Sequence, residues 1–338
     1  MYDKLTNHSW RGIISSEVIN MPGKVWTDSD VDQLLEDGKT KSASYLAQEF
    51  GVTCQAVIDK LRKLGTSLKE LHGETWTESD TELLRQHFEY APKEYIARLF
   101  PQRSWNGILQ RGNKVLKLKR IAQDRVYVNY KFFDEWTPDS AYVFGFILAD
   151  GWIGYGRTTS GNKSIIQIEV HVKDTNVLHR IAASMDFQGS FTYQRRAVKF
   201  SVHNPYMTQR LIEKGMPYED KSHTATFPVN VPDSCLRHLI RGLIDGDGYS
   251  TYDGNTYKIG LCGTYDIVSH VHNLVPVDLS TIKIQQSTSN CYYFNVQGQK
   301  AFKIAEWLYE DCTIWLTRKR QAYIEAKTKY LSKAPSSE

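Results

Sequence analysis

The chain has 338 residues, which is enough for two or three domains. Its content of 41% hydrophobic and 24% charged residues is typical of packed globular protein and excludes a disordered or collagen-like chain. The net charge of +4 does not by itself indicate a nucleic-acid partner. The five cysteines are scattered without a C-x-x-C pair, and neither a secretory signal nor a bilayer-spanning apolar run is visible. We therefore expect a reduced protein of the cytoplasm or nucleoid, without structural zinc and without a membrane partner.

Two similar helical units are predicted near the N-terminal end. The stretch "VWTDSDVDQLL" at residues 25–35 is echoed by "TWTESDTELL" at residues 75–84. In each copy a Trp precedes a Thr suited to cap a helix, and acids follow in the first turn. Two further helices are predicted in each copy, at residues 42–50 and 53–65 in the first and at residues 92–100 and 103–119 in the second. Three short helices with a basic third helix are typical of a helix-turn-helix domain.

The two units, residues 24–70 and 73–120, resemble Myb/SANT-like helix-turn-helix domains in their leading Trp and W-T-x-S-D start. This resemblance implies DNA binding, with a protein-interaction module as the alternative interpretation. The second unit is the stronger candidate, because its last helix is rich in cations. The DNA-binding residues predicted there are Arg111, Lys114, Lys117, Lys119 and Arg120. Residues 121–131 are expected to be a basic linker to the rest of the chain.

Two longer helices share a further pattern. "PDSAYVFGFILADG" at residues 138–151 and "PDSCLRHLIRGLIDGDG" at residues 232–248 both open with Pro-Asp-Ser and end in Asp-Gly, which are helix start and stop signals. Small residues lie four apart in each, and the two pairs are Gly145 with Ala149 and Gly242 with Gly246. Residues four apart share one helix face, so the two backbones are predicted to pack closely along these faces.

Such packing would bring Asp150 and Asp247 together at the C-terminal ends of the two helices. Two carboxylates so placed repel unless a cation lies between them, and oxygen ligands with open positions suit Mg²⁺, for which Mn²⁺ can substitute. A metal ion there can polarise a phosphate, activate water and stabilise the leaving oxygen. Gly151 and Gly248, which follow the two acids, are included as candidate metal-site residues.

The elements behind each helix recur in the same order. A strand, a strand running into a helix, two paired strands and a last helix are predicted twice, so we expect an α+β fold with a duplicated αββαββα unit. The half-domains are predicted at residues 132–230 and 231–333. Strand alternation directs one set of side chains toward the helices: Ile166, Ile168, Val170, Val172, Val198, Phe200, Val202, Ile282, Ile284, Phe294 and Val296. The opposite faces are predicted to read DNA through Gln167, Glu169, His171, Lys173, Gln194, Arg196, Lys199, Lys258, Lys283, Gln285, Tyr293 and Asn295, with a merely solvated face as the alternative.

At the two Asp-Gly helices the chain resembles a single-chain LAGLIDADG homing endonuclease with two motifs, over about residues 132–330. The second motif, "IRGLIDGDG" at residues 240–248, is close to the family pattern; the first, "VFGFILADG" at residues 143–151, has Leu148 where the family has an earlier, mainly structural Asp. The resemblance implies a DNA-binding saddle of two sheets. It also implies catalytic roles for Asp150 and Asp247 and a lysine late in each half. The order of the elements places these lysines at Lys221 and Lys319, with Arg318 and Arg320 as rivals of the second.

The expected protein is therefore a monomeric, Mg²⁺-dependent endonuclease that hydrolyses both strands of a long, pseudo-symmetric double-stranded DNA target, as in the homing of a mobile intron. The termini lack the signatures of a self-splicing protein, which favours an intron-encoded or free-standing gene. Two alternatives stay open: a non-cleaving transcriptional regulator on the same fold, and an RNA-splicing maturase that binds its own intron RNA. Retention of Asp150 and Asp247 argues against the regulator. The helix-turn-helix units favour DNA over RNA as the partner.

Overall fold

The structure is a computed structural model that describes residues 24–71, 76–121, 126–158, 161–218, 220–288 and 290–333. It divides the chain into two compact units, Met1–Thr75 and Trp76–Glu338. Within the described ranges, none of the helices combines the length and apolarity needed to cross a membrane.

The first unit is a bundle of short helices, α1 (Asp28–Asp37), α2 (Ala43–Glu49), α3 (Cys54–Lys63) and α4 (Leu68–Leu71). Thr27 caps α1 as predicted, because its hydroxyl accepts from the amide of Asp30 while the Asp30 carboxylate accepts from the amide of Thr27. The Trp26 ring lies 5.2 Å from the ring of Phe50, beside a small core of its own. These helices agree with the predicted first copy of the helical repeat.

The second copy opens the larger unit with α5 (Glu78–His87), α6 (Lys93–Leu99) and α7 (Trp105–Leu109), the last continued by π-helical turns over Gln110–Val115. Thr77 and Asp80 repeat the reciprocal cap, and the rings of Trp76 and Phe100 again lie 5.2 Å apart. The last helix is shorter than the predicted 103–119. It ends before Lys117, whose φ of 57° is left-handed and cannot continue a right-handed helix.

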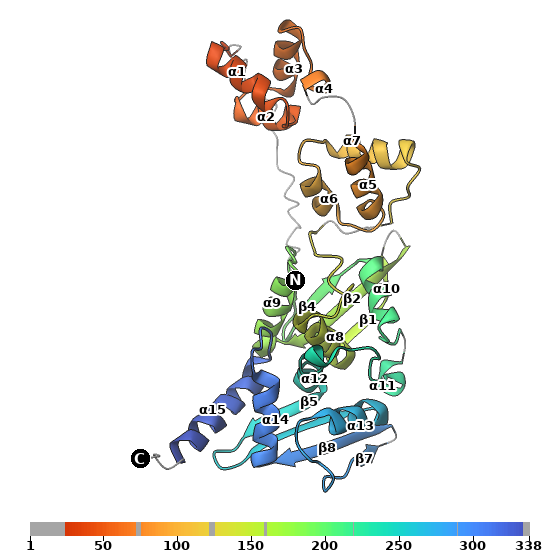
Figure 1. Ribbon diagram of the computed structural model, residues 1–338, viewed down its shortest axis with the longest axis vertical. Coiled ribbons are helices and arrows are strands. Elements are labelled where there is room, and N and C mark those ends of the chain that lie inside the picture. Colours follow the sequence, from red (N-terminus) through yellow and green to blue (C-terminus); the bar gives the residue numbers. More distant parts are fainter. Residues whose placement is uncertain are drawn as a thin grey trace, which may run out of the picture. The chain divides into compact units, whose positions relative to one another are not determined.

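The remainder consists of two copies of one α+β design (Figure 1). The first contains α8 (Pro138–Asp150), β1 (Gly151–Thr158), β2 (Gly161–His171), a 3₁₀ turn (Val172–Asp174), α9 (Thr175–Ser184), β3 (Thr192–Tyr193), β4 (Ala197–Val202), α10 (Pro205–Glu213) and α11 (Lys221–Thr224). The second contains α12 (Asp233–Asp247), β5 (Gly248–Tyr252), β6 (Tyr257–Gly263), α13 (Tyr265–Leu274), β7 (Gln285–Thr288), β8 (Cys291–Gln297), α14 (Gln299–Tyr309) and α15 (Thr317–Lys333). The antiparallel sheets have the orders β1-β2-β4-β3 and β5-β6-β8-β7, so equivalent strands occupy equivalent places. This confirms the predicted duplication.

Each sheet buries one face, largely as the alternation predicts. The inward residues of β2, β4 and β8 are buried: Ile166, Ile168, Val170, Val198, Phe200, Val202, Phe294 and Val296. Val172 departs from the prediction and is 44% exposed, because β2 ends at His171 and the chain turns into the 3₁₀ segment. Ile282 and Ile284 are half-buried but precede β7, which begins only at Gln285, so Lys283 lies before the strand rather than on it.

The segment predicted as a basic linker, residues 121–131, is packed against the protein over much of its length. Val128 and Tyr130 are almost completely buried in the main core, and the amide of Asn129 donates to the carbonyl of Met185. Residues 122–125 of the predicted linker lie outside the described residues. The linker is therefore docked on the protein over residues 126–131, because burial of Val128 and Tyr130 decides where its backbone lies.

Candidate active site

Helices α8 and α12 pack side by side in close contact (Figure 1). We call this contact the seam, and its foot is the end where the two helices finish at Asp150 and Asp247. A Cβ atom on Gly145 would lie 2.3 Å from the carbonyl oxygen of Leu239, and one on Gly242 would lie 2.2 Å from that of Tyr142. Both positions therefore tolerate only hydrogen, since carbon and oxygen do not approach so closely without a bond. The predicted packing along the small-residue faces is confirmed.

The glycines after the two acids serve a related steric purpose. Gly151 and Gly248 have extended backbones, with φ of −94° and −96°, so each helix passes directly into the strand that follows. A Cβ on Gly248 would lie 2.5 Å from the carbonyl oxygen of Gly260. Glycine is needed here for close backbone approach and not for a left-handed helix cap. The acid before each glycine is thereby fixed at a helix–strand junction.

The structure brings Asp150 and Asp247 into one electrostatic environment at the foot of the seam. They are the last residues of α8 and α12, and both side chains are open to solvent on one side. Gly246, the neighbour of Asp247, lies against Ala149 and the amide of Asp150. Desolvation by the surrounding protein, reinforced by the charge of Asp150, raises the pKa of Asp247 to about 6. Desolvation likewise raises the pKa of Asp150, although Lys319 and Lys221 oppose it.

Lys221 closes the C-terminal end of α8. Its ammonium group donates to the carbonyls of Ile147 at 3.2 Å and Gly151 at 2.7 Å, and also to that of Ala149. Ala149 lies in the last turn of α8, whose carbonyls a helix end leaves without intrahelical partners, and the helix dipole favours a cation there. Burial lowers the pKa of Lys221, while Asp247 and Asp150 counteract this. The lysine is therefore held within the field of both acids.

Lys319 has the equivalent position at the end of α12 and is 1% exposed. Its ammonium group donates to the carbonyls of Ile244 at 2.6 Å, Asp245 at 2.8 Å and Gly248 at 2.5 Å. Burial lowers its pKa to about 8. The two lysines thus repeat one arrangement in the two halves, each closing the helix that carries the acid of its own half.

The two arginines considered as rivals of Lys319 lie in other contacts. Arg318 is exposed and forms an ion pair with Asp174 at 3.2 Å, and the guanidinium of Arg320 lies 4.3 Å from the centre of the Trp315 ring. Neither donates to the end of α12 as Lys319 does.

The oxygen ligands that Asp150 and Asp247 offer fit a hard divalent cation. The carbonyls of Gly151 and Gly248 accept from lysine ammonium groups, so a cation on these oxygens would meet a like charge, and we leave them out of the candidate metal site. In the described ranges no group of three or more His, Cys, Asp or Glu side chains could form a closed metal cage. Two carboxylates with open positions match Mg²⁺, which keeps waters and takes phosphate oxygens, better than they match structural zinc.

Residues 134–325, more than half of the chain, match the LAGLIDADG_4 family model, which is described as "Putative archaeal homing endonuclease". The chain belongs to the LAGLIDADG homing endonuclease family. It is accordingly a site-specific DNA endonuclease by family, and its two Asp-Gly helices are the two copies of the motif that names the family.

Solved structures of LAGLIDADG proteins are similar to the chain at low sequence identity. They include the meganuclease I-AabMI bound to uncleaved DNA (13% identity, TM-score 0.41, covering 59% of this chain and 92% of that one). I-LtrWI bound to target DNA (11%, 0.39, 61% and 92%) and I-GzeII in complex with a DNA target (11%, 0.39, 60% and 94%) are further examples. No curated protein sequence matches the chain.

Sequence reasoning missed two buried polar residues in the second LAGLIDADG helix. Arg241 is completely buried and donates to the carbonyls of Ile314 at 2.9 Å and Leu308 at 2.9 Å. Asp245 is 1% exposed and accepts from the amide of Leu316 at 2.8 Å. Both hold the chain just before α15, the helix whose first turn carries Lys319. Their signal in the sequence was an Arg and an Asp four residues apart within the run 239–245, whose other residues are Leu, Ile and Gly.

The side chains predicted to read DNA from the two sheets are all accessible. Lys199 pairs with Glu169 across the first sheet at 3.0 Å, and Tyr293 donates to Gln285 at 2.7 Å across the second. Exposed residues are Glu169, His171, Lys173, Gln194, Arg196, Lys283, Gln285 and Asn295, and half-buried ones are Gln167, Lys199, Lys258 and Tyr293. The strands carry polar faces as predicted, but Lys173, Gln194, Arg196 and Lys283 lie just outside the strands, and contact of all these residues with DNA stays a prediction.

The five cations predicted to bind DNA in the second helical unit separate into two groups. Lys114, Lys117 and Lys119 are exposed. Arg111 donates to the hydroxyl of Thr81 at 3.0 Å, and Arg120 donates to two backbone carbonyls within the unit at 2.5 Å each. The two arginines therefore hold parts of the unit together, and contact of the five cations with DNA stays a prediction.

Proposed function

We propose that the chain is a Mg²⁺-dependent endonuclease that cuts both strands of a long, pseudo-symmetric DNA target, with Mn²⁺ as a substitute metal. The supporting observation is the close approach of the ends of α8 and α12, where Gly246 lies against Ala149 and where Asp150, Asp247, Lys221 and Lys319 act on one another electrostatically. Each half, residues 132–230 and 231–333, contributes one acid and one lysine. A single chain then presents two related cleavage centres to two strands and acts as a monomer.

Asp150 and Asp247 would hold the divalent metal, which when bound polarises the scissile phosphate and favours the ionised form of a water ligand. Their elevated pKa values describe carboxylates whose negative charge lacks a full counterbalance, and a divalent cation would supply one. The ammonium groups of Lys221 and Lys319 are already held by backbone carbonyls at the helix ends, so their positive charge is in position before the reaction begins. Preorganised charge of this kind stabilises the additional negative charge that develops on the phosphate during hydrolysis.

The polar faces of the two sheets would form the DNA-binding saddle. Gln, Asn, Lys, Arg and His side chains can donate to or accept from base edges in the major groove or contact phosphates. The helical units, residues 24–70 and 73–120, are proposed to be Myb/SANT-like modules that add DNA contacts, supported by the reciprocal Thr–Asp caps and Trp–Phe pairs found in both.

A library of duplexes incubated with the full chain and Mg²⁺ tests the proposal. The wild type should cut a subset of sites, whereas Asp150→Asn and Asp247→Asn should each abolish double-strand cutting and retain DNA binding. Asp32→Asn removes an equal charge from an exposed position on α1 and should leave cutting intact. Sequence-specific binding without cutting by the wild type would instead identify a regulator. Intron-RNA splicing assistance that survives both active-site substitutions would identify a maturase.

A further inference from the structure

The second helical unit is fastened to the first half-domain by a continuous core. We call the described residues 76–121 of this unit the arm. Apolar residues of the arm belong to the same buried cluster as residues of the half-domain: Leu84, Phe88, Ile96, Phe100 and Ile108 on one side, and Phe133, Val143 and Met207 on the other. Shared burial of this kind resists relative motion, because separating the two parts would expose apolar surface to water.

Buried hydrogen bonds fix the orientation in which the arm is docked. Asn204, which is completely buried, donates to the carbonyl of Tyr90 in the arm at 3.1 Å and accepts from the amide of Met207 at 3.1 Å, where it caps α10. His87 of the arm and Tyr130 share a buried hydrogen bond of 2.7 Å. Leaving such groups without partners is unfavourable, so these bonds specify one docked orientation.

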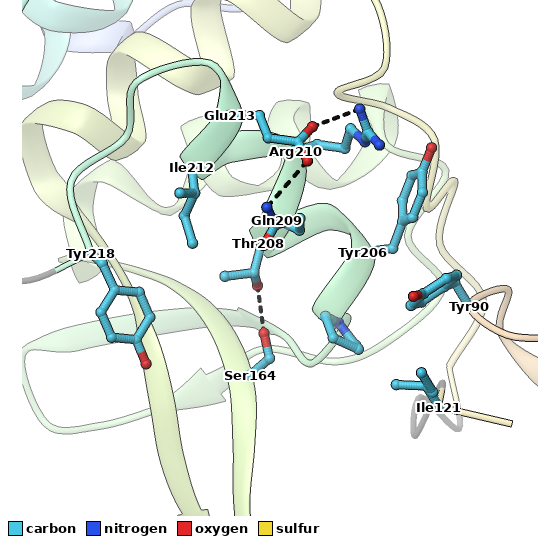
Figure 2. A pocket seen from close by; sticks show the side chains of 11 residues that line it. Tyr90, Ile121, Ser164, Tyr206, Thr208, Gln209, Arg210, Ile212, Glu213 and Tyr218 are labelled. Atoms are coloured by element: carbon cyan, nitrogen blue, oxygen red, sulfur yellow. Dashed lines mark hydrogen bonds and ion pairs between the residues drawn. The ribbon is translucent and has the colours of Figure 1, made fainter. Parts of the chain in front are cut away.

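Further contacts lie around the rim. Arg98 of the arm donates to Gln188 at 2.8 Å, and its guanidinium lies 3.9 Å from the centre of the Tyr127 ring. Figure 2 shows Tyr90 and Ile121 of the arm beside Tyr206 of α10, around a cavity of about 550 Å³. The contacts therefore surround the junction on several sides, and all of them reach the first half-domain.

The C-terminal part of the arm is basic. The sequence contains no Asp or Glu between Arg103 and Ile121. Within this stretch Lys114, Lys117 and Lys119 are exposed, whereas Arg111 and Arg120 are half-buried and bond to other parts of the unit. Lysine is a compact charge that suits phosphate without reading base identity.

We propose that the arm is a rigid extension of the first half-domain that binds DNA phosphates beyond one end of the saddle through Lys114, Lys117 and Lys119. This inference rests on the proposed function in taking DNA as the partner. It differs from a tethered module in one respect. A tethered module samples many positions on flanking DNA, whereas a docked arm reaches one short group of phosphates at a fixed distance from the cleavage centre.

Hydroxyl-radical footprinting in Mg²⁺-free buffer tests this with the full chain and a target that carries long flanks. The wild type should protect one discrete flank patch on one side only, and stepwise shortening of that flank should reduce affinity in a single step. The triple variant Lys114→Ala/Lys117→Ala/Lys119→Ala should lose the patch and the step. Its slope of log affinity against log salt should fall by about 0.9 for each lost phosphate contact. The matched variant Lys303→Ala/Lys327→Ala/Lys329→Ala, which removes three cations from α14 and α15 of the second half-domain, should keep both.

The rigidity of the arm can be tested separately by the same footprinting experiment. The variant Arg98→Ala/Asn204→Ala removes two docking contacts, and it should turn the discrete patch into weak protection spread along the flank. If that variant does not fold, the width of the wild-type patch decides instead. Diffuse protection by the wild type, or an arm-lysine variant that binds every flank length like the wild type, would overturn the inference. Loss of Mg²⁺-dependent cutting with an intact footprint would count against the proposed function alone.

Discussion

The phenol of Tyr142 on α8 donates a hydrogen bond of 2.8 Å to the carboxylate of Asp245 on α12, and both side chains are buried. Asp245 accepts a second bond of 2.8 Å from the amide of Leu316. One carboxylate therefore links the two motif helices to the segment that leads into Lys319. The matching position of the first motif is Leu148, whose apolar side chain cannot make these bonds. The two halves thus place their lysines by different means.

Replacing Asp245 with leucine, the residue of the first motif, should affect one cleavage centre more than the other. Removal of the carboxylate leaves the hydroxyl of Tyr142 and the amide of Leu316 buried without their partner, and we expect a loss of about 3 kcal/mol in the free energy of unfolding. Strand-specific nicking should slow mainly on the strand served by Lys319. Tyr142→Phe, which removes a single bond, should cost about 1 kcal/mol. Equal slowing of both strands by Asp245→Leu would contradict the positioning role.

The seam should not accept even one methyl group. Gly242→Ala would place a carbon atom 2.2 Å from the carbonyl oxygen of Tyr142, so the helices would have to separate. We expect a loss on the order of 3 kcal/mol in urea unfolding, together with weaker cutting. Gly263→Ala is the control, because a Cβ there would meet nothing nearer than 3.9 Å and should change stability by less than about 0.5 kcal/mol. Comparable destabilisation by the two substitutions would refute a special role for the seam.

Lys319→Met should reduce the rate of cutting without removing DNA binding. Methionine keeps much of the apolar stem but cannot supply the positive charge beside Asp150 and Asp247. Loss of one preorganised stabilising group lowers the rate by about 10²–10³-fold. Single-turnover cleavage at saturating protein would measure this, with circular dichroism as a check of folding. Arg318→Met, at an exposed neighbouring position, should stay within a few-fold of the wild type.

Stability should fall in mild acid because of His238. Burial, reinforced by the charge of Arg241, lowers the pKa of this histidine to about 4, whereas in the unfolded chain it titrates near its ordinary value of 6.5. Between these values the unfolded state binds the additional proton, so the contribution of His238 is complete above pH 6.5 and is lost as the pH falls toward 4. The integrated loss is on the order of 3 kcal/mol.

Unfolding by urea at intervals from pH 7 to pH 4 would measure this loss, with His238→Gln as the comparison. Asp247 and Asp245 have raised pKa values and act with the opposite sign, since an acid of this kind favours the folded state as the pH falls. The difference between wild type and variant therefore isolates the histidine. An identical pH dependence in both proteins would show that His238 does not contribute.

The seam was predictable because its requirement is local and steric. Small residues four apart occur in both helices, and this spacing is typical of helices whose backbones pack closely. The duplicated order of strands could be predicted for a similar reason, since each strand alternates apolar and polar residues. The prediction failed at Val172 because it extended the alternation past His171, where the strand ends.

The basic stretch before the first motif could not be resolved from its composition. Lysines and arginines contribute equally to net charge, but Arg111 and Arg120 reach inward to oxygen acceptors that become neighbours only in the folded unit. Likewise, the buried side of residues 126–131 depends on contacts such as that of Asn129 with Met185, which no local pattern reveals. The number of charged residues can be read from the sequence, whereas the direction in which each side chain points depends on the fold.

At the C-terminal ends of α8 and α12, Ala149 lies against Gly246. A Cβ on Gly246 would lie 2.3 Å from the Cβ of Ala149, so one side provides the methyl group and the other provides the space for it. Two copies of the first half would set methyl against methyl, and two copies of the second would leave a gap. The match is best when unlike halves of the same gene product meet. The fused chain thus carries a built-in bias against the pairing of two like halves, and each half is free to diverge toward its own side of an asymmetric target.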